Sequence, residues 1–203
     1  MKTTKEKIIT EAARLFMKQG FAGTTVAEIG NAIGISASSL FSHFTSKEEI
    51  YKYAVEKYIM GIQSPQKRFE ECNTSSLQKF IDCYLQKISD SMDMVQNIVQ
   101  EGRRSHIQYY YFLLESSLRD EESRNKLINL DRKEIELWES VIKKAQEKGE
   151  VRNDKSANAI AETFYYAFVG ASYSLSFDNG ATIKQLRQVL NTIYKSIKNQ
   201  ETV

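Results

Sequence analysis

Side chains that could carry out chemistry are scarce in this chain of 203 residues. The histidines, His43 and His106, and the cysteines, Cys72 and Cys83, have spacings that fit no metal site. No glycine-rich phosphate loop is present, and two dispersed histidines do not define a catalytic triad. We therefore expect no enzymatic activity, no cofactor and no metal. Two cysteines are too few for a disulfide framework, so we interpret them as unrelated thiols, with a redox pair as the alternative.

The stretch from Thr24 to Lys47 predicts three short helices, because each helix start carries a side chain that can cap it. The capping residues are Thr25, Ser36 and Ser46. Glu28 and Glu49, three residues after Thr25 and Ser46, could each close a capping box. Between the first two helices, Gly34 can take the left-handed conformation that turns the chain. Helix, glycine turn, helix is a helix-turn-helix unit.

The second helix of this unit has an apolar inner side and a small, uncharged outer side. Its apolar residues Ile35, Leu40 and Phe44 can face Val26, Ile29 and Ile33 of the first helix. The outer residues are Ser36, Ala37, Ser38, Ser39, Phe41, Ser42 and His43. Such a surface can enter the groove of a duplex and approach base edges closely. A compact trio of helices without DNA contact is the alternative.

The composition is that of a helical globular protein. Apolar residues make up 41% and charged residues 27% of the chain, and Pro65 is its one proline. Long helices are therefore favoured over a turn-rich sheet. The net charge of +2 does not by itself indicate a nucleic-acid partner. No run of about 18 apolar residues occurs and the N-terminus lacks the apolar core of a signal peptide, so we expect a cytoplasmic protein without a membrane partner.

Apolar spacing predicts helices along the rest of the chain. We expect them over residues 3–20, from Ser46 to about residue 61, from Leu77 onwards, and over 121–148, 154–177 and 182–199. The sequence Gly102–Ser105 predicts a break between two helices. The aromatic run Tyr109–Leu114 could locally form a strand, but nothing near it offers a partner strand.

The two long helices each carry more apolar surface than one core requires. On the helix over 154–177, one face carries residues such as Phe164 and Phe168, while Tyr166, Gly170, Tyr173 and Phe177 form a second face. The apolar residues of the helix over 121–148 spread over about half of its circumference. We expect helices 121–148 and 154–177 to form the interface of a homodimer, as a four-helix bundle. A larger monomeric core is the alternative.

Residues 8–51, IITEAARLFMKQGFAGTTVAEIGNAIGISASSLFSHFTSKEEIY, resemble the tetracycline-repressor (TetR) family of bacterial transcription regulators. The shared features are A-A-x-x-L-F-x-x-x-G-F, T-T-V-x-x-I, a glycine and a β-branched residue before the recognition helix, and L-aromatic-x-H-F-x-S-K-E. The resemblance covers about a quarter of the chain, and K-G-E-V-R between two long helices is a further familiar feature. It implies an all-helical homodimer that reads a palindromic operator with its N-terminal domain. The C-terminal domain would dimerise and hold a small inducer.

Carried over by position, the resemblance implies base contacts for Ser36, Ala37, Ser38 and Phe41, and phosphate contacts for Thr25, Ser39, His43 and Lys47. Thr25 and Lys47 stand at expected helix starts, where free N–H groups and the helix dipole attract anions. The sequence departs from the family at Ser38, where glycine is common, and at Phe41, where tyrosine is common. Phe41 can still contact a thymine methyl group, but it cannot donate the hydrogen bond of a tyrosine.

The family also places an inducer pocket among its middle helices. On that basis, the candidate wall residues are Tyr84, Ile88, Met92, Tyr110, Phe112, Trp138 and Phe164. Their side chains would suit an apolar or aromatic small molecule, although aromatic residues at helical spacing also form ordinary cores.

These observations give an all-α protein with a helix-turn-helix DNA-binding domain over residues 1–48 and a dimerisation and effector-binding domain over residues 49–203. The preferred hypothesis is a ligand-responsive transcriptional repressor that binds a palindromic operator as a homodimer. The alternatives are a helical interaction module without DNA affinity and a helical enzyme, and the missing acid, base or metal set argues against the enzyme.

Overall fold

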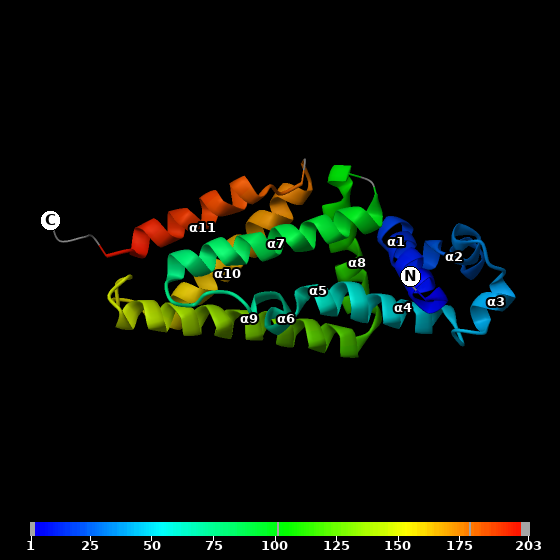
Figure 1. Ribbon diagram of the computed structural model, residues 1–203, viewed down its shortest axis with the longest axis horizontal. Coiled ribbons are helices and arrows are strands. Elements are labelled where there is room, and N and C mark those ends of the chain that lie inside the picture. Colours follow the sequence, from blue (N-terminus) through cyan, green and yellow to red (C-terminus); the bar gives the residue numbers. More distant parts are fainter. Residues whose placement is uncertain (1–2, 101, 179, 200–203) are drawn as a thin grey trace. The chain divides into compact units, whose positions relative to one another are not determined.

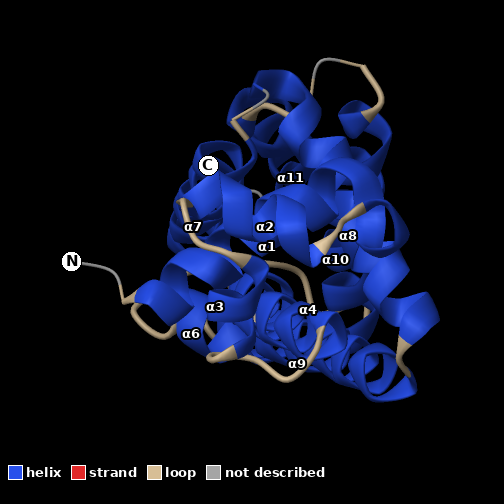
Figure 2. Cartoon of the chain, turned by 90° about the vertical axis from the view of Figure 1, so that its right-hand side faces the viewer, coloured by secondary structure: helices blue, strands red, loops and turns tan. Residues whose placement is uncertain are grey.

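A computed structural model describes residues 3–100, 102–178 and 180–199. Within these ranges the chain forms helices and no strand (Figures 1 and 2), with a single isolated bridge between Val151 and Lys198. The expected all-α class is therefore confirmed, and the run Tyr109–Leu114 is helical. None of the described helices combines the length and the apolar character needed to cross a bilayer.

The helices group into two compact units, which we call unit 1 and unit 2. Unit 1 consists of Met1–Gln63 with Asp93–Leu127, and unit 2 consists of Ser64–Met92 with Ile128–Val203. This division differs from the expected domain boundary after residue 48, because the helix that begins at Lys47 packs against the first helix of the chain. The boundary after residue 48 remains a proposal about function.

Unit 1 contains the N-terminal helices. They are α1 (Thr4–Gly23), α2 (Val26–Ile33), α3 (Ala37–Phe41), α4 (Lys47–Val55), the π-helical turn η1 (Glu56–Met60) and α5 (Gly61–Gln63). The unit also includes the 3₁₀ turn η2 (Gly102–Arg104), α8 (Ser105–Arg119) and the adjoining ends of α7 (Leu77–Val99) and α9 (Glu121–Glu147). The helix expected from Ser46 and the break expected at Gly102 are thus both present.

The end of α1 is shaped by Gly20. Its backbone is non-helical, with φ +74° and ψ 172°, so the chain turns there and makes one more helical turn to Gly23. A Cβ atom at this position would lie 2.4 Å from the hydroxyl of Tyr111, which packs against the turn. The expected stop at Gly20 is therefore a kink that only glycine fits, because both its backbone angle and its surroundings exclude a side chain.

Unit 2 contains the remaining helices. They are α6 (Pro65–Phe69), the first part of α7, the second part of α9, α10 (Ala157–Ser176) and α11 (Ile183–Ile197). Pro65 stands at the first position of α6, where its missing N–H costs nothing. The core is aromatic: the ring of Trp138 stacks on Phe164 at 4.9 Å and meets the edge of Phe80 at 4.8 Å.

The two cysteines form a disulfide bond in unit 2, which shows that the interpretation of unrelated thiols was wrong. Cys72 lies three residues beyond the end of α6, and Cys83 lies in the second turn of α7. The loop between α6 and α7 reverses the chain and brings their Cα atoms to 5.6 Å. A separation of 11 residues does not reveal this pairing, because the distance depends on how the loop folds back.

Candidate nucleic-acid interface

The helix-turn-helix unit is built by the local signals expected from the sequence. The Thr25 hydroxyl accepts the Glu28 N–H at 3.1 Å, and the Glu28 carboxylate accepts the Thr25 N–H at 2.7 Å, so this capping box is confirmed. Gly34 has φ +75° and ψ 31°, the left-handed conformation that turns the chain towards α3. The Ser36 hydroxyl caps α3 by accepting the Ser39 N–H at 3.1 Å.

The cap of α4 differs in one detail from expectation. The Ser46 hydroxyl accepts the Glu49 N–H at 3.1 Å, as expected. The Glu49 carboxylate, however, accepts the N–H of Thr45 at 2.6 Å and its hydroxyl at 2.8 Å, so the expected capping box on Ser46 was wrong. The carboxylate reaches one residue further back because the Thr45 hydroxyl offers it a second donor.

Gly30 is a further glycine that this fold requires and that was not predicted from the sequence. A Cβ atom on Gly30 would lie 2.7 Å from the Ile35 carbonyl oxygen, so α2 and the turn approach too closely for any side chain there. The Ile35 N–H also donates to the Gly30 carbonyl at 3.0 Å. This close approach and this hydrogen bond hold the turn against the end of α2. A glycine four residues before the turn glycine was the only sequence signal for it.

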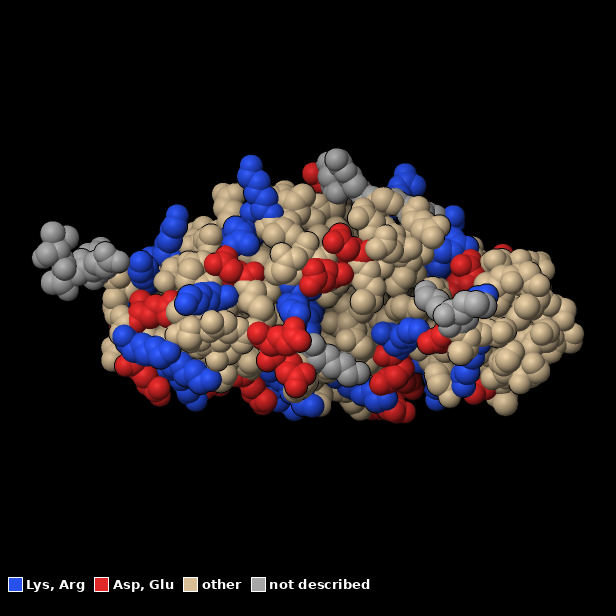
Figure 3. Space-filling view, viewed as in Figure 1, with Lys and Arg blue, Asp and Glu red and all other residues tan. Residues whose placement is uncertain are grey.

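The outer side of α3 is exposed and uncharged. The Phe41 side chain is 50% exposed, while Leu40 on the inner side is fully buried. Ser36, Ser38, Ser39, Ser42 and His43 are exposed, and Ala37 is half-buried. No Asp, Glu, Lys or Arg occurs between Glu28 and Lys47. Accordingly, the face of α2 and α3 that is visible in Figure 3 shows mostly uncharged side chains.

Some of the serine hydroxyls on this side are already engaged. Ser36 and Ser38 share a hydrogen bond of 2.9 Å, and the Ser42 hydroxyl donates to the Ser39 carbonyl at 2.7 Å. Because a hydroxyl carries one donor and two acceptor sites, these residues keep acceptor capacity towards a base edge. The six expected residues of the Ser36–His43 segment thus lie on or beside one short helix.

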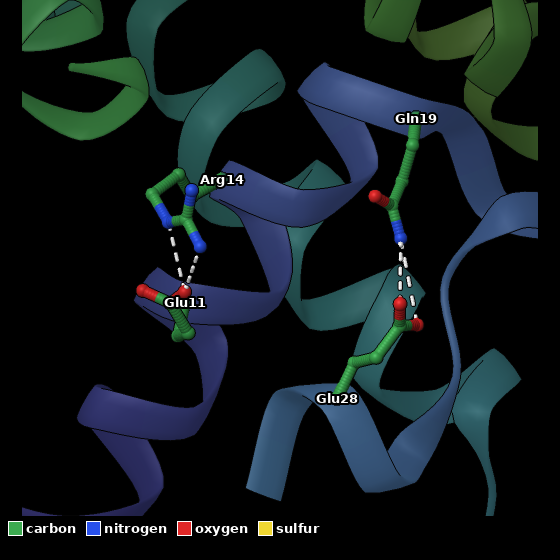
Figure 4. Close-up of polar contacts among 4 residues, drawn as sticks. All are labelled: Glu11, Arg14, Gln19 and Glu28. Atoms are coloured by element: carbon green, nitrogen blue, oxygen red, sulfur yellow. Dashed lines mark hydrogen bonds and ion pairs between the residues drawn. The ribbon is translucent and has the colours of Figure 1, made fainter. Parts of the chain in front are cut away.

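The expected phosphate residues Thr25 and Lys47 already have partners inside the protein. Thr25 donates its N–H and its hydroxyl to Glu28, and the same carboxylate lies 3.4 Å from the amide nitrogen of Gln19 in α1 (Figure 4). These hydrogen bonds lower the pKa of Glu28, with the backbone N–H of Thr25 as the largest cause. The start of α2 therefore already holds an anion, which is the carboxylate of Glu28.

The Lys47 side chain binds backbone carbonyl groups at the end of α1. Its ammonium donates to the carbonyl oxygens of Phe21 at 2.9 Å and Thr24 at 2.8 Å, and it lies 4.1 Å from the centre of the Phe21 ring. These contacts hold the turn between α1 and α2. An ammonium has three N–H donors, so two carbonyls leave one donor for a phosphate oxygen.

Side chains of helix α8 also contact the turn after α1. Both carboxylate oxygens of Glu115 accept the Phe21 N–H, at 3.0 and 3.1 Å, and the Tyr51 hydroxyl donates to Glu115 at 3.4 Å. The Arg119 guanidinium stands 3.6 Å above the Phe21 ring. Burial, followed by the charge of Glu115, raises the pKa of Tyr51. Because Phe21 is 94 residues from Glu115, no local pattern indicated this contact.

The seven candidate effector residues do not lie together in one unit. Tyr110 and Phe112 belong to unit 1, and the other five belong to unit 2. In unit 2, the buried rings of Tyr84 and Trp138 lie 4.9 Å apart. The Tyr84 hydroxyl donates to Glu134 at 2.6 Å, and Arg68 pairs with the same carboxylate at 2.6 Å. Burial, followed by the charge of Glu134, raises the pKa of Tyr84.

The second face of α10 is exposed. The exposed fractions are 60% for Tyr166, 45% for Tyr173 and 60% for Phe177. Gly170, on the same stripe, has no atoms within 4 Å of its Cβ position. The expected second face of α10 is thus a stripe of exposed aromatic side chains around a glycine.

Comparison with known proteins agrees with the geometry of the N-terminal helices. Residues 8–54 match the family model for bacterial regulatory proteins of the tetR family. An uncharacterised HTH-type transcriptional regulator of Bacillus subtilis, YerO, is 33% identical over 138 residues, which is 63% of this chain and 47% of YerO. The biofilm operon negative regulator IcaR of Staphylococcus epidermidis is 44% identical over 52 residues, which is 26% of this chain and 28% of IcaR. The chain thus spans less than half the length of these relatives.

A solved structure extends the likeness of the fold to the C-terminal helices. A putative transcriptional regulator from Saccharomonospora viridis in complex with choline has a TM-score of 0.72 at 17% identity, covering 97% of this chain and 98% of that one. The N-terminal helices of this chain therefore resemble the tetR family of bacterial regulatory proteins in sequence, and the whole chain shares the fold of this solved regulator.

Proposed function

We propose that this protein is a DNA-binding transcriptional regulator that binds a palindromic operator as a homodimer and acts as a ligand-responsive repressor. The exposed, uncharged outer side of α3 carries the proposal, because a helix with small side chains can approach base edges in the major groove. Repression is supported by IcaR, which is named a negative transcriptional regulator.

The DNA contacts are tested by selecting genomic fragments with the purified protein and measuring the affinity for the selected operator. We expect Phe41→Ala to weaken operator binding about tenfold or more, because a base contact contributes on the order of 1–3 kcal/mol. Met94→Ala is a matched control, since Met94 is 49% exposed and Phe41 is 50% exposed in the same unit. If no fragment is selected, the protein is an interaction module without DNA affinity.

The homodimer would use the exposed face of α10 together with α9. Burying Tyr166, Tyr173 and Phe177 against a second copy would remove three large apolar side chains from water. Gly170 would let the two copies of α10 approach closely. We expect light scattering to give a dimer mass for the native chain and a monomer mass for Tyr173→Glu. Leu118→Glu, a change at an exposed residue of α8, should leave the dimer intact.

The effector would bind against the aromatic residues of unit 2, and its surface would be mostly apolar or aromatic. Trp138 is the one tryptophan of the chain and stacks on Phe164, so its fluorescence reports on this region alone. A panel of aromatic compounds should include one that shifts Trp138 emission and lowers operator affinity at the same concentration. A compound that lowers affinity without changing the emission would place the effector elsewhere. The choline complex of the Saccharomonospora viridis regulator supports small-molecule binding by this fold.

A further inference from the structure

The disulfide between Cys72 and Cys83 joins a very short helix to a long one. Helix α6 has five residues, and Cys72 follows it, while Cys83 belongs to the 23-residue helix α7. A helix of five residues is not stable by itself in water, so the contacts that α6 makes must hold it. Both cysteines lie in unit 2, and they are the only two of the chain.

Apart from the disulfide, α6 is held by two neighbouring side chains. Arg68 pairs with the buried carboxylate of Glu134 at 2.6 Å, and the ring of Phe69 stacks on Tyr84 at 4.7 Å. Tyr84 donates to the same carboxylate, so α6 and the aromatic core share one buried polar cluster. Any loosening of α6 therefore exposes the charge pair and uncovers the face of Tyr84.

Of the two cysteines, Cys83 is the more exposed. Cys72 is 7% exposed, whereas Cys83 is only partly buried. Lys79 and Lys87 stand four residues before and after Cys83 on α7, on the same side of the helix. The ammonium of Lys87 lies 3.3 Å from the carboxylate of Glu71, which offsets part of its charge. Nearby cations favour a thiolate, the form in which a cysteine exchanges with disulfides.

We propose that Cys72 and Cys83 form a reversible redox site, which exchanges with small dithiol and disulfide compounds and controls how firmly α6 is held. A dithiol reductant attacks Cys83 through one thiolate and releases the Cys72 thiolate, which takes up a proton. The second thiol of the reductant then displaces Cys83 from the mixed disulfide, which leaves two protein thiols and an oxidised, cyclic reductant. Two electrons and two protons pass to the protein, and a small disulfide reverses the exchange.

A sensing role is preferred over a permanent crosslink because of where a DNA regulator works, and this step rests on the proposed function. Proteins that read chromosomal DNA work among reduced thiols, where disulfides in most organisms are transient or redox-sensing.

The chain entropy of loop closure gives the size of the effect of the disulfide on the opening of α6. For a loop closed over 11 residues of separation, the lost chain entropy disfavours the open state by roughly a hundredfold.

The test uses the full-length native chain and needs no DNA, so its failure is separate from a failure of the proposed function. The protein is equilibrated in buffers with graded ratios of oxidised to reduced dithiothreitol, and free thiols are counted by mass after alkylation. In parallel, amide hydrogen exchange is measured for residues 64–76. We expect one reversible two-thiol transition, with exchange of this segment up to roughly a hundredfold faster in the reduced form.

Two outcomes would overturn the proposal. One is a thiol count that does not change reversibly with the buffer ratio. The other is an unchanged exchange rate over residues 64–76 when the count does change. The double variant Cys72→Ser, Cys83→Ser should exchange like the reduced native chain and should not respond to reductant. If that variant does not fold, the oxidised and reduced native chains still decide the question.

Discussion

Replacing Glu115 should loosen the turn that leads into the helix-turn-helix unit. The carboxylate accepts the Phe21 N–H with both oxygens, and a hydrogen bond to a charged group contributes about 1.5–3 kcal/mol. The contact with the Tyr51 hydroxyl at 3.4 Å is long and adds little. We therefore expect Glu115→Ala to lower the free energy of unfolding by about 2 kcal/mol. Glu115→Gln should lose less, because its amide oxygen can still accept the N–H.

Urea unfolding followed by two signals can assign this loss to unit 1. Trp138 lies in unit 2, so its fluorescence follows that unit, whereas circular dichroism follows all helices. We expect the change to appear in circular dichroism and in amide exchange over α1 and α2, with operator affinity reduced as well. Glu121→Ala is the control, because the Glu121 side chain is 77% exposed. Equal stability of Glu115→Ala and Glu121→Ala would refute the reasoning.

Three further changes test other parts of the structure. Gly20→Ala should destabilise the protein more than Gly34→Ala, as measured by thermal unfolding, because both have positive φ but only Gly20 has an atom within 3 Å of its Cβ position. Arg68→Met should lower the free energy of unfolding in urea by about 3–5 kcal/mol, since it leaves the buried Glu134 carboxylate without its cationic partner, whereas Arg187→Met, in an exposed pair, should lower it by less than about 1 kcal/mol. The pKa of Glu28 is lowered in the folded state, so its contribution is present above the unfolded pKa and is lost as pH falls. Acid titration of Glu28→Gln should therefore show a smaller loss of stability below about pH 4.5 than titration of the native chain.

The parts of the fold that could be predicted from the sequence are those fixed within one helical turn. The cap of Thr25 and the turn at Gly34 were predicted because their partners lie within four residues. The two apolar faces of α10 were also predicted, because helical periodicity alone separates Phe164 from Tyr166. In these cases the local backbone determines which groups can meet.

The contacts that organise the surroundings of the site could not be predicted in this way. Glu115 reaches Phe21 across 94 residues, and Arg68 reaches Glu134 across 66 residues. Charged residues at such positions look like ordinary solvated side chains until the packing brings their partners close. The same holds for the disulfide, because the cluster Asn73–Ser76 predicts a loop but does not predict how close that loop brings Cys72 and Cys83.

Lys47 is where the predicted and the observed roles can be separated by experiment. Its ammonium donates to two carbonyl oxygens of the turn, so Lys47→Ala lowers affinity whether or not the residue contacts phosphate. The salt dependence distinguishes the two cases, because each neutralised phosphate contributes about 0.9 to the slope of log K against log salt. If Lys47 contacts phosphate through its third donor, a dimer loses two such contacts in Lys47→Ala. The slope of log K against log salt should then become shallower by about 2.

A purely structural role predicts a weaker complex with an unchanged slope. Lys47→Arg is the informative partner variant, since it keeps the charge but changes the shape of the donor group. We expect this variant to keep the native slope even where its affinity falls. Because the segment between Glu28 and Lys47 has no other cation, a slope that stays constant in Lys47→Ala would mean that phosphate neutralisation comes from outside this segment.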